Sequence, residues 1–146
     1  MSVKITKALE SALLADELDP GLFANGFASW KAGDEYGNYL FGKDSAYVNP
    51  EVDGKRYVLR HVHLVPLTDV AQLAQWDKVW RRKGRKTSDR ALVYVSDDKG
   101  NHLLIYILDE PDAHAIASMK TTQYKEIMEG LAEVAAEFLE SGEVLN

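Results

Sequence analysis

The chain has 146 residues, of which 46% are hydrophobic, and its formal net charge is -6. We expect one globular domain over residues 1–146, because this length and apolar content suit a single core. No stretch approaches the roughly 20 apolar residues that a helix needs to cross a bilayer. The absence of cysteine excludes disulfides and thiolate catalysis but does not by itself fix the compartment. Because the start of the chain lacks the apolar stretch of a secretory signal, we expect a cytoplasmic protein.

The first third of the chain predicts a strand, a helix and a long loop. "VKIT" at residues 3–6 alternates as a strand does, although the same residues could open a helix through "KALESALLADEL". Asp19 and Pro20 are a suitable N-cap and first residue for a second helix that Gly33 ends. Residues 34–55 are rich in turn residues and are expected to form a loop leading into a hairpin.

The rest of the chain predicts three strands and three helices. The strands are expected at 57–65, 91–96 and 102–108, the last two joined by the tight-turn composition "DDKGN". A helix over residues 70–80 is expected to end in a basic run, and Pro111 favours a helix start near 109–111. Residues 124–139 carry an apolar stripe opposite glutamates, which predicts a C-terminal amphipathic helix.

These elements predict the α+β class, with a small antiparallel sheet and helices packed on one face of it. Alternation places His61 and His63 on the same side of their strand. One register of the three strands gathers polar and aromatic side chains on the less apolar face of the sheet. These are Tyr57, His61, His63, Tyr94, His102 and Tyr106.

The charges are distributed unevenly along the chain. Residues 81–90 ("RRKGRKTSDR") carry six basic residues and one acidic one, whereas residues 125–146 carry six glutamates and one lysine. The net negative charge argues against a protein that coats nucleic acid with its whole surface. A local basic loop still suits an anionic partner, because charges beyond about 10 Å are largely screened at moderate salt.

Five segments, in order, carry a family resemblance. They are "LFANGFASWKAGD", "LFGKDSAY", "RHVHL", "SDRALVY" and "LLIYILDEPDAHAIA". Together they resemble the YafO family of bacterial toxins, which implies a type II toxin with a protein antitoxin and a fold like that of the RelE class. The resemblance also implies cleavage of mRNA on the ribosome. The positions that match the family pattern are Asp44, Tyr47, His61, His63, Ser88, Asp89, Tyr94 and His114.

The chemistry of such cleavage assigns roles to these residues. Cutting RNA without a metal or other cofactor needs a base, an acid and cations around the phosphate, and histidine can take either proton role near neutral pH. We therefore expect His61 and His63 to be catalytic, with support from Asp44, Tyr47, Ser88, Asp89 and His114. We expect RNA or ribosome contacts from Arg60, Arg81, Arg82, Lys83, Arg85, Lys86, Arg90 and Tyr94.

Alternatives remain for each group. The histidines can complete a half-buried sheet, the basic loop can simply be solvated, and Trp76 and Trp80 are expected in the core because their spacing is helical. Tyr94 can pack, His114 can make a structural hydrogen bond, and the two aspartates can cap turns. An H-x-H pair also suits a metal, but no third ligand has a recognisable spacing. The competing functions are a noncatalytic RNA- or ribosome-binding module and a protein-interaction domain that uses the acidic C-terminal helix.

Overall fold

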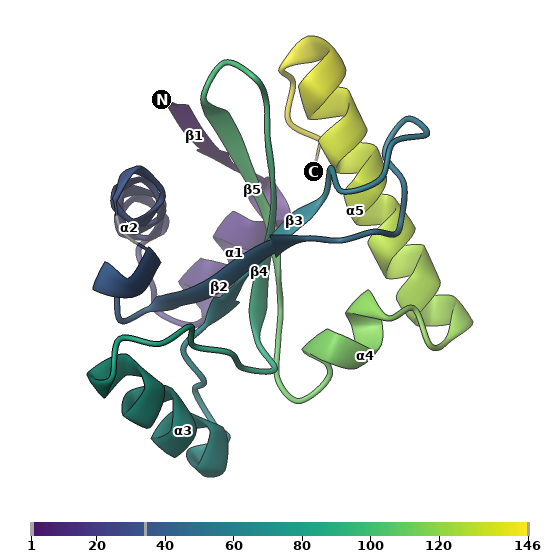
Figure 1. The fold of residues 1–146 in the computed structure, drawn as a ribbon. Helices are drawn as coiled ribbons and strands as arrows, with labels where there is room; N and C mark the ends of the chain where they lie inside the picture. Colours follow the sequence, from purple (N-terminus) through teal and green to yellow (C-terminus); the bar gives the residue numbers. More distant parts are fainter. Residues whose placement is uncertain (1, 34, 146) are drawn as a thin grey trace.

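The computed structural model describes residues 2–33 and 35–145, and its strands form one mixed five-stranded sheet in the order β1-β5-β4-β3-β2 (Figure 1). The strands are β1 (Ser2–Ile5), β2 (Phe41–Ala46), β3 (Arg60–Leu64), β4 (Ala91–Ser96) and β5 (Asn101–Leu108). β1 runs parallel to β5, whereas the other neighbouring strands are antiparallel. The sheet is therefore antiparallel except at the β1 edge.

Within the described residues, five α-helices and one short 3-10 helix accompany the sheet. They are α1 (Lys7–Ala15), α2 (Pro20–Ala32), η1 (Glu35–Gly37), α3 (Val70–Arg81), α4 (Ala113–Ala117) and α5 (Thr122–Ser141). Helices α1, α2, α3 and α5 each begin with an N-cap side chain that accepts a hydrogen bond from a backbone N–H in the first turn. These N-cap residues are Thr6, Asp19, Asp69 and Thr121. The C-terminal amphipathic helix is confirmed.

Helices cover both faces of the sheet, and this corrects the prediction that they pack on one face. Helices α1 and α2 pack on one face through a core that includes Leu9, Phe27 and Leu92. Helices α4 and α5 lie on the opposite face, where the core includes Val93 and Met128 (Figure 1). The reason is that β4 and β5 are apolar on both sides, so that both faces must be buried. The α+β class itself is confirmed.

The register of the sheet also corrects the predicted polar face. His61 pairs with Val93, but Arg60 pairs with Tyr94, so Tyr94 lies on the face opposite to the histidines. The pairing of β4 with β5 is irregular between Val93 and Tyr94. A shift of one residue exchanges the two faces of a strand, which is why alternation read from one strand did not carry to the next.

Strand β2 lies in the segment that was predicted to be a loop. Gly42 explains why its composition is unusual for a strand: a Cβ at this position would collide with the backbone oxygen of Lys86 and lie 2.9 Å from a ring carbon of Trp76. The Lys43 N–H donates a 2.8 Å hydrogen bond to that same oxygen. Strand β3 begins at Arg60 rather than at Tyr57, which has a positive φ of 63°.

Candidate active site

Two imidazoles lie side by side on the face of β3 that is shared with α4 and α5. The ring centroids of His61 and His63 are 5.6 Å apart, and the ring of Tyr47 stacks on His61 with a centroid distance of 4.0 Å. Strand β4 pairs beside β3, with Val93 opposite His61 and Ala91 opposite His63. The two-residue period of the strand thus places both rings at one site, as alternation predicts.

His61 is half-buried and contacts Tyr47 and Ser45. Burial lowers its pKa from 6.5 to about 4, and the neighbouring imidazole of His63 adds to this effect. Its Nε2 lies 3.2 Å from Ser45 Oγ, while its Nδ1 is buried without a hydrogen-bond partner among the described residues. His61 is therefore neutral at pH 7 and has little access to solvent through Nδ1.

His63 is held by the backbone of Ser88. Its Nδ1 lies 2.7 Å from the Ser88 carbonyl oxygen and 3.0 Å from the Ser88 nitrogen. Burial lowers the pKa of His63, although the hydrogen bond to Ser88 opposes this shift. Its Nε2 has no hydrogen-bond partner within residues 2–33 and 35–145, so this nitrogen is the one available for proton transfer.

An open basin of about 490 Å³ adjoins His63. Asp89 and His114 border it together with residues of α3, and the His114 N–H donates a 2.6 Å hydrogen bond to Asp89 Oδ1. A smaller cavity of about 60 Å³ continues from there to His61 beneath α4. The structure thus brings together six of the predicted residues, namely Tyr47, His61, His63, Ser88, Asp89 and His114.

Lys43 is a cation at this site that the sequence analysis missed. After burial, its positive charge is among the causes that lower the pKa of both His61 and His63. Its ammonium makes no hydrogen bond or ion pair with the part of the chain that is described. The alternation of β2 would have indicated Lys43 as a neighbour of the histidines, had the segment been recognised as a strand.

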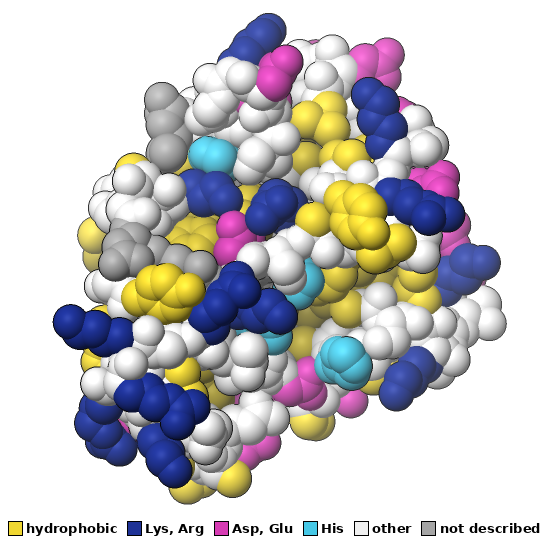
Figure 2. Space-filling view, in the orientation of Figure 1, with side chains coloured by type: hydrophobic (Ala, Val, Ile, Leu, Met, Phe, Trp, Pro, Cys, Tyr) yellow, Lys and Arg dark blue, Asp and Glu magenta, His cyan; other side chains and the backbone are white. Residues whose placement is uncertain are grey.

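The basic segment divides into exposed and buried residues. Arg81, Arg82, Lys83 and Arg85 are exposed, and Figure 2 shows Lys and Arg side chains gathered over α3 and toward the histidines at the centre of this face. Lys86, in contrast, is only 1% exposed and lies over the rings of Trp76 and Trp80. The expectation that Lys86 contacts RNA does not fit this burial.

Arg90 is likewise buried, and its Nε lies 3.3 Å from Asp109 Oδ1. Its guanidinium also donates a hydrogen bond to the Val65 carbonyl oxygen at 3.4 Å. These contacts tie β4 to the neighbouring loops. The predicted phosphate contact from Arg90 is therefore contradicted by its position in the fold.

A second polar cluster lies on the opposite face of the sheet. The buried Tyr94 hydroxyl donates a 2.6 Å hydrogen bond to Asp44 Oδ1 and accepts hydrogen bonds from Lys31 and Arg60. Asp44 Oδ2 lies 3.0 Å from Lys31 Nζ and 3.2 Å from Arg60 Nη2. Tyr94 is fully buried, which contradicts the prediction that it contacts RNA, and Asp44 is turned away from the imidazoles.

The comparisons with known proteins identify the family. The sequence profile described as "Toxin YafO, type II toxin-antitoxin system" matches residues 28–140, which is well over half of the chain. The chain belongs to the YafO family of toxins. A YafO-family toxin has a protein antitoxin as its partner. Searches among curated proteins and among solved structures found no match.

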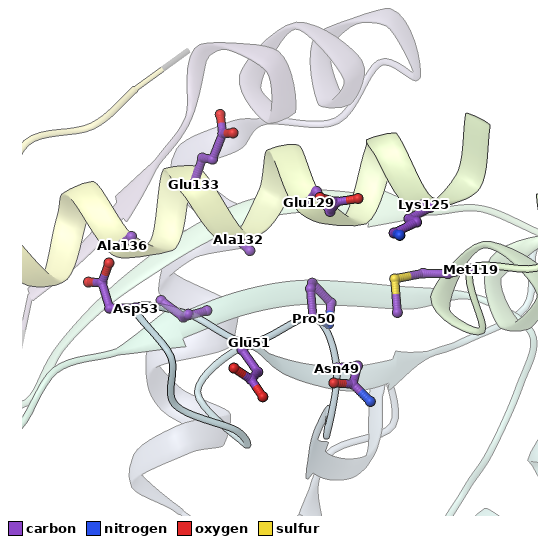
Figure 3. A pocket seen from close by; sticks show the side chains of 11 residues that line it. Asn49, Pro50, Glu51, Asp53, Met119, Lys125, Glu129, Ala132, Glu133 and Ala136 are labelled. Atoms are coloured by element: carbon purple, nitrogen blue, oxygen red, sulfur yellow. The ribbon is translucent and has the colours of Figure 1, made fainter. Parts of the chain in front are cut away.

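The groove along α5 in this YafO-family chain has the wrong charge for RNA. It measures about 430 Å³ and separates α5 from residues 49–53 (Figure 3). Its acidic residues are Glu51, Asp53, Glu129 and Glu133, against one basic residue, Lys125. Carboxylates on both walls repel a phosphate backbone, so this groove does not suit a nucleic acid.

No group of three or more His, Asp or Glu side chains that could hold a metal ion is present in the described ranges. Within those ranges, no third side chain of these types is placed to complete a metal site with His61 and His63. None of the helices described is both long and apolar enough to cross a membrane.

Proposed function

We propose that this YafO-family toxin is a ribosome-dependent endoribonuclease that cleaves mRNA in the cytoplasm through the 2'-hydroxyl, without a metal. The observation that carries the proposal is the position of His63, which lies at an open basin while its Nδ1 is anchored to Ser88. Four exposed cations precede Ser88 by only a few residues. Lys and Arg side chains are present on the face of the molecule that also shows His side chains (Figure 2).

The reaction divides into two proton transfers. A base removes the proton from the 2'-hydroxyl, the 2'-oxygen attacks phosphorus, and the 5'-oxygen leaves with a proton from an acid, giving a 2',3'-cyclic phosphate and a free 5'-hydroxyl. A neutral imidazole at pH 7 suits the base, and burial keeps His63 neutral by lowering its pKa. We assign this role to Nε2 of His63.

The two contacts of His63 Nδ1 with the Ser88 backbone support this role in both tautomers of the imidazole. When Nδ1 carries the proton, it donates to the Ser88 carbonyl and leaves a lone pair on Nε2; when Nε2 carries the proton, Nδ1 accepts from the Ser88 N–H. The ring thus keeps a hydrogen bond in both tautomers. The acid role falls to His114, which borders both the basin and the smaller cavity, while the neutral His61 packs beside His63.

The cations would hold the RNA and stabilise the developing charge on the phosphate. The charge of Lys43 acts on both imidazoles, since it helps to lower the pKa of each. Further cations are available on the exposed side chains of Arg81, Arg82, Lys83 and Arg85. Contacts of this kind between cations and phosphates position the nucleic acid without reading its sequence. Placement of the mRNA on the ribosome would then decide which bond enters the basin.

The test is a cleavage assay with purified toxin, ribosomes and a defined mRNA. Cleavage is expected with ribosomes present, and His63→Ala is expected to abolish most of it while the folded state persists. His102→Gln is the matched control, because His102 lies on the opposite face, where its Nδ1 contacts Ser96 Oγ at 2.6 Å. Intact mRNA with the wild-type toxin rejects the proposal.

The partial burial of both imidazoles favours one alternative, a noncatalytic module that binds the ribosome. Such a module retains ribosome binding and inhibits translation after both His61 and His63 are replaced by alanine. It also yields no RNA fragments. Measuring translation and fragment formation with the same double variant separates the two functions.

A further inference from the structure

An apolar cavity of about 200 Å³ lies between the start of α2 and the ends of β2 and β3. Leu22 and Leu67 stand at its mouth with 71% and 55% of their surfaces exposed, and the exposed Leu18 and Leu40 complete the rim. The floor is formed by buried side chains such as Phe41 and Leu64. A ring of exposed leucines around an apolar cavity is typical of a site that another protein covers.

This cavity is separate from the histidine site. Phe41 and Leu64 belong to the core beneath α1 and α2, whereas His61 and His63 lie on the other face of β3. Arg90 is the charged residue of the lining, and its guanidinium is occupied by Asp109 and the Val65 carbonyl oxygen. The cavity therefore presents an apolar surface that the proposed cleavage chemistry does not use.

Carboxylates border the cavity at two ends. Glu17 and Asp19 flank Leu18 along the chain, and the Asp19 carboxylate accepts a 3.1 Å hydrogen bond from the Leu22 N–H. At the other end, Glu110 Oε1 accepts hydrogen bonds of 2.6 Å from the N–H groups of Leu67 and Thr68. The charge that complements this rim is positive.

We propose that the cavity is the docking site of the protein antitoxin, which inserts apolar side chains from an amphipathic helix and places Lys or Arg side chains against the bordering carboxylates. The antitoxin is the occupant because membership of the family gives this chain a protein partner. A helix with apolar residues on one face and basic residues beside them matches both the cavity and its rim. The inference rests on family membership and not on the proposed nuclease function.

The docking site lies on the face opposite to the imidazoles. The helix that docks there anchors the antitoxin without occluding the basin at His63.

The experiment measures binding of the purified cognate antitoxin to the full-length toxin by calorimetry, with no ribosome or RNA present. Leu22→Asp and Leu67→Asp are each expected to weaken binding about tenfold or more, because an anchor at the centre of an interface is replaced by a charge. Ile127→Asp is the matched control, since Ile127 is 41% exposed on α5 and lies far from the cavity lining. It is expected to leave the affinity unchanged.

A second pair of variants tests the charge of the rim. Glu17→Lys is expected to weaken binding and to reduce its dependence on salt, whereas Glu126→Lys on α5 is expected to change neither. Circular dichroism of each variant confirms that it is folded. Affinities of both leucine variants within twofold of the wild type, or an equal loss in Ile127→Asp, overturn the proposal.

Sedimentation of the toxin alone separates antitoxin docking from self-association. A wild-type dimer that Leu22→Asp converts to a monomer, with antitoxin affinity unchanged, assigns the cavity to a second copy of this chain and overturns the proposal. A toxin that is equally monomeric in both forms, with weaker antitoxin binding in the variant, supports it. Both the binding and the sedimentation results can be interpreted even if the toxin does not cleave RNA, because neither experiment contains RNA.

Discussion

The Tyr94 hydroxyl donates a 2.6 Å hydrogen bond to Asp44 Oδ1 across two strands of the sheet that are not neighbours. Lys31 of α2 and Arg60 of β3 donate to the same hydroxyl. Burial raises the pKa of Tyr94 well above its usual range. The carboxylate of Asp44 adds to this shift, and the guanidinium of Arg60 opposes it. The cluster fastens the edge strand β2 to the centre of the sheet.

The first prediction is that Tyr94→Phe destabilises the fold. The variant removes the donor to Asp44 and leaves this half-buried carboxylate, Lys31 and Arg60 each with one hydrogen-bond partner fewer, which costs about 1 to 3 kcal/mol. Urea denaturation measures this loss. Tyr106→Phe is the control, because Tyr106 is partly exposed. Unchanged stability combined with weaker ribosome binding would contradict the structural role.

The helices were predictable because their signals are local. Asp19 caps α2 and is followed by Pro20, and both the cap and the apolar spacing lie within a few residues of the helix that they define. The strand β2 was missed because its signal is not local. Gly42 is required by the approach of Lys86 and Trp76, which are distant in sequence, and a glycine within a polar segment is otherwise typical of a loop.

The candidate site was partly predictable for the same reason. The two-residue period of a strand places His61 and His63 on one face, and this follows from neighbouring residues alone. The pairing of Tyr94 with Arg60 depends on the register between strands, and the depth of Lys86 depends on how the segment after α3 folds against Trp76 and Trp80. Neither is encoded in a local pattern.

The second prediction compares two glycines. Gly42→Ala is expected to destabilise the protein by about 2 to 4 kcal/mol, since backbone and an indole ring must move to admit the new methyl group. Gly130→Ala on α5 is the matched control. Its new methyl group meets no atom within 4 Å, and alanine favours the helix, so a gain of about 0.5 to 1 kcal/mol is expected. Thermal unfolding of both variants measures the contrast.

The third prediction separates a buried cation from an exposed one. Lys86→Met is expected to lower stability by about 1 to 3 kcal/mol, because it removes the hydrogen bond to the Asn38 carbonyl oxygen and the ammonium over two indole rings. Arg82→Met is expected to leave stability unchanged and to weaken ribosome binding with a smaller salt dependence. The reverse pattern, with stability lost in the Arg82 variant, would contradict these assignments.

The fourth prediction concerns stability in acid. The pKa of His61 is about 4 in the folded chain, against about 6.5 in the unfolded chain, so the unfolded state binds more protons between these values. The contribution of His61 to the free energy of unfolding is therefore fully present above pH 6.5 and is lost as the pH falls toward 4. Between pH 7 and pH 5 the wild type is expected to lose about 1 to 2 kcal/mol more than His61→Gln, as measured by urea denaturation. An identical loss in both would contradict the depressed pKa.

The last prediction concerns Lys43 and depends on the proposed nuclease function. If its ammonium stabilises the phosphate during cleavage, Lys43→Gln is expected to slow cleavage about 100-fold, which is the usual effect of removing one preorganised donor, while ribosome binding changes much less. Lys43→Arg is expected to recover part of the rate. Lys55→Gln, a change at an exposed position outside the strands, is the control.

The pH profile of Lys43→Gln distinguishes this role from a purely structural one. Because the charge of Lys43 lowers the pKa of His63, removing that charge raises this pKa toward its ordinary value. A general base loses activity below its pKa, so the acid limb of the cleavage profile is expected to move to higher pH. A slower variant whose acid limb does not move would place Lys43 outside the electrostatic environment of the imidazole, and its contribution would then be to RNA binding alone.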